Sequence, residues 1–102
     1  IESEVLAENV PLSYGGKEFL AEKVECSKLS IAFYLAEYAD PTERMYRCFK
    51  AFDANGDLIP FIWNSLAAAD GESSMIWARF DEPIEPETVC KLTFNGETIF
   101  ER

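Results

Sequence analysis

Residues 89–102 are VCKLTFNGETIFER, two apolar stretches on either side of an Asn-Gly pair. Leu92 and Phe94 would share one face of an extended strand, because successive side chains in a strand point to opposite faces. Asn-Gly readily adopts the positive φ angles of a two-residue hairpin turn. The stretch therefore predicts an antiparallel hairpin with strands from Val89 to Phe94 and from Thr98 to Glu101.

Two upstream segments alternate in the same way, LSIAFYL (residues 29–35) and SMIWARF (residues 74–80). Scattered Gly and Pro residues separate these and other apolar segments, as in proteins built from short strands. The small and polar residues 64–74 between them predict a loop. We therefore predict one all-β domain over residues 1–102, a small antiparallel immunoglobulin-like β-sandwich of about seven strands.

One segment leaves a second fold open. In DPTERMYRCFKAF, Asp40 is a plausible helix N-cap, with Pro41 at the first helical position and Glu43 three residues after the cap. The same segment is rich in aromatic residues and leads directly into an Asn-Gly turn, which favours strand, turn and strand. An α+β fold with a helix from Asp40 to Phe52 is the alternative.

The composition predicts a folded, acidic domain. Hydrophobic residues make up 48% of the 102 residues and aromatic residues 14%, too many for a disordered chain. Nineteen acidic residues against nine basic ones give a formal net charge of -10. Because such a chain repels phosphate backbones and anionic lipids, we expect no nucleic acid partner.

The ends of the chain bear on its cellular context. No apolar run reaches the roughly 18 residues that a membrane helix needs, so we expect no direct membrane insertion by this segment. The first ten residues lack the basic start and apolar centre of a signal peptide. Since the chain begins at Ile1 rather than Met, we expect a domain excised from a longer protein.

Three cysteines, Cys26, Cys48 and Cys90, lie far apart in the sequence without a CxxC motif. This spacing disfavours a zinc ribbon or a thioredoxin-like redox pair. Each cysteine lies in an apolar segment, so we interpret them as small buried hydrophobic residues. A disulfide between two of them is the alternative.

The stretch DANGDLIP (residues 53–60) raises the question of a metal site. Asp53, Asn55 and Asp57 place oxygen-bearing side chains at alternate positions, which makes them a weak calcium candidate. An EF-hand loop needs Gly at its sixth position and Glu at its twelfth, where this chain has Leu58 and Asn64. We therefore predict a hairpin turn without metal, and no cofactor.

The residue inventory argues against catalysis. The chain has no His, which removes Ser-His and Cys-His relays. Acidic residues cluster at Asp81, Glu82, Glu85 and Glu87, but intervening prolines make a solvated connection the simpler interpretation than a carboxylate pair. We predict that the domain is not an enzyme.

Aromatic side chains are the remaining candidates for a binding surface. Exposed aromatic residues can contact carbohydrate or protein. The candidate ligand contacts are Trp63, Trp77, Tyr38 and Tyr46. Two tryptophans aligned on one exposed face would favour sugar stacking, whereas burial in the core would not.

Three segments together resemble a known family: residues 15–35 (GGKEFLAEKVECSKLSIAFYL), 52–60 (FDANGDLIP) and 78–99 (ARFDEPIEPETVCKLTFNGETI). They resemble the extracytoplasmic immunoglobulin-like domain of membrane-anchored anti-sigma-factor-like proteins of Gram-positive bacteria. That domain has a D-x-x-G turn, an F-x-x-P segment and a Gly-Glu pair near the closing strand. The matching residues here run from Asp53 to Gly56 and from Phe80 to Pro83, with Gly96 and Glu97.

The resemblance implies a non-enzymatic binding or sensory module outside the membrane, tethered through a segment beyond this sequence. It also implies an unidentified protein partner. The matched positions are structural, so no catalytic or ligand residue carries over. A carbohydrate-binding module that uses exposed aromatic residues is the alternative function.

Overall fold

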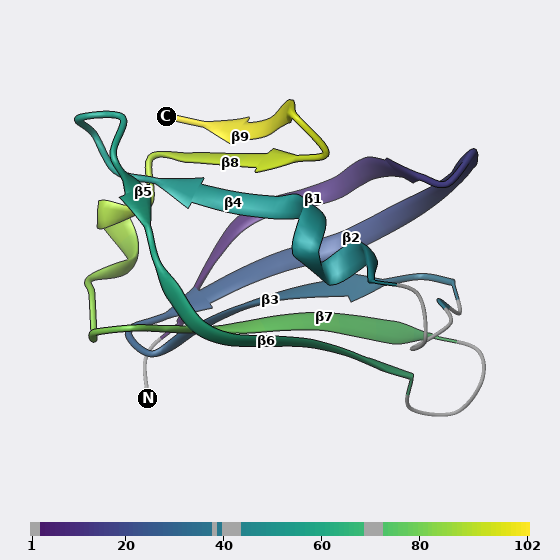
Figure 1. The fold of residues 1–102 in the computed structure, drawn as a ribbon, viewed down its shortest axis with the longest axis horizontal. Helices are drawn as coiled ribbons and strands as arrows, with labels where there is room; N and C mark the ends of the chain where they lie inside the picture. Colours follow the sequence, from purple (N-terminus) through teal and green to yellow (C-terminus); the bar gives the residue numbers. More distant parts are fainter. Residues whose placement is uncertain (1–2, 38, 40–43, 69–72) are drawn as a thin grey trace.

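The computed structural model describes residues 3–37, 39, 44–68 and 73–102, which form two antiparallel β-sheets (Figure 1). Within these residues there are nine strands and two short 3₁₀ turns. The elements are β1 (Ser3–Tyr14), β2 (Lys17–Ser27), β3 (Ser30–Leu35), η1 (Met45–Cys48), β4 (Phe49–Phe52), β5 (Leu58–Ile59), β6 (Phe61–Ala68), β7 (Ser74–Phe80), η2 (Pro86–Thr88), β8 (Lys91–Phe94) and β9 (Glu97–Glu101).

The two sheets have simple strand orders. One has five strands in the order β1-β2-β3-β7-β6, and the other has four in the order β5-β4-β8-β9. This arrangement confirms the predicted all-β sandwich. The number of strands exceeds the predicted seven partly because β5 has only two residues and only two of the twelve residues of β1 are buried. Both form through pairing with a neighbouring strand more than through their own sequence.

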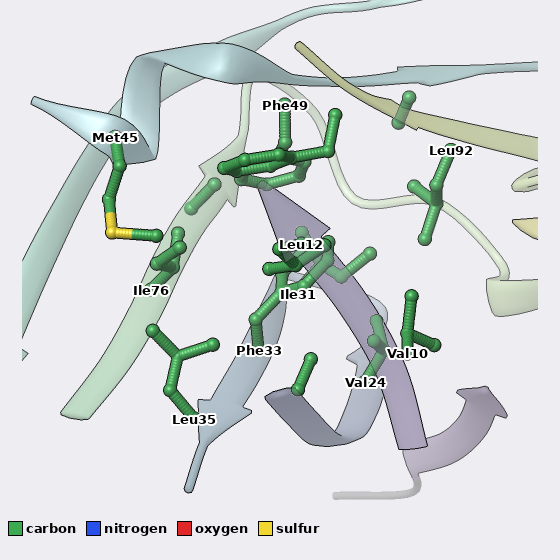
Figure 2. Packing of buried hydrophobic residues seen from close by; sticks show 14 of the residues in the cluster. Val10, Leu12, Val24, Ile31, Phe33, Leu35, Met45, Phe49, Ile76 and Leu92 are labelled. Carbon is green, nitrogen blue, oxygen red and sulfur yellow. The ribbon is translucent and has the colours of Figure 1, made fainter. Parts of the chain in front are cut away.

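The core lies between the sheets and follows the alternation of the strands. In β3, Ile31, Phe33 and Leu35 are buried, and in β7 the inward residues include Ile76 and Ala78. Figure 2 shows side chains from the two sheets converging, with Phe49 of β4 above Leu12, Ile31 and Phe33. The ring centroids of Phe33 and Phe49 are 4.6 Å apart. Aromatic packing therefore joins the layers.

The helix alternative is wrong for the part of residues 40–52 that the structure describes. One 3₁₀ turn, Met45–Cys48, is followed directly by β4 (Phe49–Phe52). Strand geometry wins because it buries alternate residues Phe49 and Ala51 against the core. Asp40 and the proposed capping residues after it lie outside the described residues.

The predicted loop over residues 64–74 is also wrong at both ends. β6 continues to Ala68, and β7 begins at Ser74. Residues 69–72 lie outside the described residues. Ser74 is buried, and its hydroxyl donates to the Glu37 carbonyl at 2.7 Å and accepts from the Ala39 N–H at 3.0 Å. Ser74 therefore holds the segment after β3 in place through hydrogen bonds to its backbone.

The C-terminal hairpin is confirmed. Lys91–Phe94 pairs with Glu97–Glu101 around Asn95 and Gly96, whose φ angles are 53° and 85°. After it, the Arg102 guanidinium forms an ion pair with Glu4 at 3.2 Å. β1 and β9, the edge strands of the two sheets on this side, also contact each other, and β6 is the other edge of the five-stranded sheet (Figure 1).

Candidate binding surface around strand β6

The chain changes sheets at Pro60, between β5 and β6 (Figure 1). Phe61 is paired with Phe80 and Trp63 with Arg79, so two residues of β6 correspond to one of β7 and Ile62 is the extra residue of a β-bulge. A bulge reverses the alternation of side chains beyond it. As a result Phe61 packs against the core, while Trp63 faces outward.

The two tryptophans meet on the outer face of the five-stranded sheet. Trp77 alternates with the buried residues Ile76 and Ala78, so its ring points away from the core. The ring centroids of Trp63 and Trp77 are 4.9 Å apart and their planes make an angle of 75°. Trp63 is 55% exposed, whereas Trp77 is half-buried. The tryptophans therefore share one face but are not coplanar.

The outer face continues from Trp77 across β7 and β3. A shallow depression there is lined by Glu25, Ala32, Tyr34, Met75 and Trp77, with three serines at one side. The Tyr34 hydroxyl donates to Glu25 Oε1 at 3.3 Å, and Lys23 Nζ lies 4.8 Å from the centroid of the Tyr34 ring. These contacts fix the Tyr34 ring in place.

A second depression lies where the chain crosses between the sheets, and we call it the crossover groove. It is lined by Arg47, Phe49, Lys50, Leu58, Ile59, Pro60, Phe61, Ile62, Trp63 and Asn64. Leu58, Ile62 and Trp63 have exposed fractions of 55%, 57% and 55%, the largest among the exposed large hydrophobic side chains of the described residues. Exposed apolar side chains are therefore concentrated at one edge.

Of the two predicted tyrosine contacts, Tyr38 lies outside the described residues, and Tyr46 is not part of this outer face. Tyr46 lies in η1, half-buried against the core, and its carbonyl accepts a hydrogen bond from Asn64 Nδ2 at 3.3 Å. The prediction missed Leu58 and Ile62. The turn before Leu58 could have indicated an exposed position, but no sequence signal marks the bulge at Ile62.

The calcium candidates form a turn. Asp53 Oδ1 accepts hydrogen bonds from the backbone N–H groups of Asn55 (2.9 Å) and Asp57 (3.0 Å). Gly56 has a φ of 81°, which favours glycine, whereas Asn55 does not have a positive φ. Among the residues that the structure describes, no group of three or more His, Cys, Asp or Glu side chains could hold a metal ion. The Asp53 carboxylate is thus committed to the turn.

Replacing Asp53 with alanine should lower the free energy of unfolding by about 1 to 2 kcal/mol, because two backbone donors lose a charged acceptor. Asp57→Ala is the matched control, since no hydrogen bond is recorded for that exposed carboxylate, and it should cost less than about 0.5 kcal/mol. Urea unfolding, in EDTA and in millimolar calcium, measures both. Equal losses for the two variants would contradict this role.

The acidic cluster and the cysteines form no site with this groove. Asp81, Glu82, Glu85 and Glu87 are all exposed, and Glu85 pairs with Lys28 at 3.3 Å. The three thiols are free, with Cys26 buried and the other two half-buried. Burial, with the nearby charge of Glu4 as a smaller cause, raises the pKa of Cys26 to about 12, against a lowering effect of Arg102.

Comparison with protein-family models, with curated proteins and with solved structures found no match for this chain. Among the described residues, no helix has the length and apolar character needed to cross a membrane. The candidate site therefore stands on its own geometry. It consists of an outward tryptophan pair and, beside it, an apolar groove that carries two basic side chains.

Proposed function

We propose that this domain is a non-enzymatic binding or sensory module that contacts a protein partner on the outer side of a bacterial membrane. The location follows from the resemblance of the sequence to the extracytoplasmic immunoglobulin-like domain of anti-sigma-factor-like proteins. The observation that carries the proposal is the concentration of Leu58, Ile62 and Trp63 in the crossover groove. Exposed apolar patches of this kind mark interaction sites.

Physical chemistry favours a protein as the ligand of this surface. Removing a large apolar side chain from water is worth about 1.5 to 3 kcal/mol, so covering the three exposed side chains would supply substantial binding energy. Trp and Arg are also the residues most enriched at the energetic centres of protein interfaces. Trp63 and Arg47 both line the groove.

Carbohydrate binding is the second candidate, and one observation supports it. Trp63 and Trp77 lie in contact on the same outer face of the sheet. However, their planes differ by 75°, so a sugar that stacks on one ring meets the other ring at a steep angle. The pair offers one stacking surface instead of an extended flat platform, which is why we rank this function second.

Replacing Trp63 with alanine should weaken binding of peptides selected on the wild-type domain from a displayed random library by about 30-fold, equivalent to about 2 kcal/mol. Leu20→Ala is the control, because Leu20 is also exposed but lies on β2, three strands from β6 in the sheet order. Its effect should stay under about 3-fold. Fluorescence anisotropy with labelled peptides measures both affinities.

Two results would overturn the protein-contact function. One is the absence of any peptide whose binding depends on Trp63. The other is a cell-wall glycan that protects the tryptophans from acrylamide quenching while no peptide does, which would establish the carbohydrate-binding alternative. The proposed location is tested separately, by protease accessibility of the domain within its parent protein on intact cells.

A further inference from the structure

We infer that the crossover groove takes an acidic segment of the partner, with an apolar side chain set into the groove and carboxylates beside Arg47 and Lys50. This inference rests on the proposed function, because it names the chemistry of the partner for the same surface. It goes further in that it fixes the sign of the partner's charge and the mode of contact.

The charge of the groove is opposite to that of the whole chain. Arg47 and Lys50 both line the groove and are exposed, and none of the described residues that line it is acidic. This is unusual in a chain with 19 acidic residues and nine basic ones. The ion pairs among the described residues use Lys23, Lys28 and Arg102, and none of these pairs includes Arg47 or Lys50.

The groove exists because β5 pairs with only part of the edge of β4. β5 pairs with Ala51 and Phe52, which leaves the Phe49 and Lys50 end of β4 facing the start of β6. At the base of the groove the ring centroids of Phe49 and Phe61 lie 5.0 Å apart. An aromatic or aliphatic side chain of the partner would meet the half-buried Phe61 ring, which covers the buried Phe49, while its neighbouring carboxylates reach the two cations.

Side-chain capture suits this edge better than addition of a strand. Pro60 has no N–H to offer, and its carbonyl already accepts a hydrogen bond from the Asp81 N–H at 3.1 Å. The bulge at Ile62 interrupts the regular backbone spacing, and the Asn64 side chain lies along this edge, where its Nδ2 donates a hydrogen bond to the Tyr46 carbonyl. Bulges and prolines of this kind protect sheet edges from pairing with another strand.

A short acidic peptide also fits better than a polyanion. Screening limits charge interactions to about 8 Å at physiological salt, so two or three carboxylates in the groove respond mainly to Arg47 and Lys50. A nucleic acid or an anionic lipid surface would extend over the rest of a chain whose net charge is -10. The local cations therefore select a small acidic segment.

The test compares peptide selections on two variants of the domain with the same change in net charge. Arg47→Glu with Lys50→Glu reverses the groove cations, whereas Lys17→Glu with Lys28→Glu reverses two exposed lysines that do not line the groove. We expect peptides selected on the wild-type domain to carry Asp or Glu beside an aromatic or aliphatic residue. Their affinity should fall at least about 10-fold on the groove variant and under about 3-fold on the control.

Selection on the groove variant should in turn enrich Lys and Arg in place of Asp and Glu. Peptides that depend on Trp63 but bind equally well when their acids are replaced by amides would overturn the acidic partner and leave the proposed function intact. Failure to select any peptide that depends on Trp63 would overturn both. The two failures are therefore distinguishable by one affinity measurement on Trp63→Ala.

Discussion

Replacing Phe33 with alanine should lower the free energy of unfolding by about 3 to 5 kcal/mol, the range for truncation of a buried phenylalanine. Phe33 is 0% exposed, lies on the central strand β3 of the five-stranded sheet, and contacts the Phe49 ring of the opposite sheet. The variant would lose both transferred apolar surface and the packing that joins the layers. The total free energy of unfolding of a domain of this size is about 5 to 15 kcal/mol.

Urea unfolding followed by circular dichroism measures this loss, with Phe33→Leu as the conservative variant. Leucine keeps most of the apolar volume, so it should cost about 1 to 2 kcal/mol and remain folded even if the alanine variant does not. Phe100→Ala, at the half-buried edge strand β9, is the control for removal of a ring and should cost less than Phe33→Ala. A loss under about 1 kcal/mol for Phe33→Ala would show that Phe33 does not join the sheets.

Alternation along the chain was enough to predict much of this core. Ile31, Phe33 and Leu35 alternate with less apolar positions, and a period of two applies wherever one face of a strand is buried. The Asn-Gly pair at residues 95–96 likewise predicted its hairpin, because the positive φ angles are a local property of those residues. Local rules therefore identified the sandwich.

The position of Trp63 could not be predicted from alternation. A regular strand would place Phe61 and Trp63 on the same face, and Ile62 on the other. The bulge that separates their faces depends on the pairing of β6 with β7, which is a contact between distant parts of the chain. Prediction of an exposed Trp63 thus required knowledge of the register.

The groove likewise depends on contacts between distant parts of the chain, which bring its basic residues beside its apolar ones. Arg47 and Lys50 come from η1 and β4, whereas Leu58 and Ile62 come from β5 and beyond. In the sequence these cations follow Arg44 at three-residue intervals, between Glu43 and the acidic turn at Asp53. Only the crossing of the chain between the sheets brings them beside the exposed apolar residues.

The Cys26 thiol should react with a thiol reagent at pH 8 about 1,000-fold more slowly in the folded domain than in the unfolded chain. The thiolate is the reactive form, and a pKa of about 12 in place of 9.0 reduces its fraction at pH 8 by about that factor. Burial is the main cause of the raised pKa, and it also blocks access of the reagent. A variant with Cys48→Ala and Cys90→Ser isolates this one thiol.

The same pKa predicts how stability depends on pH. The folded domain keeps the Cys26 proton up to about pH 12, whereas the unfolded chain releases it near pH 9.0. The neutral thiol therefore contributes its full share to the free energy of unfolding below pH 9. Above pH 9 the free energy of unfolding declines by about 1.4 kcal/mol per pH unit. Urea unfolding between pH 8 and 11 should show this slope in the single-cysteine variant, and a smaller slope once Cys26→Ala is added. Parallel pH curves of the free energy of unfolding for the single-cysteine variant and its Cys26→Ala derivative would contradict a buried neutral thiol. Labelling of Cys26 as fast as in the unfolded chain would contradict it too. Either result requires a thiolate that forms in the folded domain.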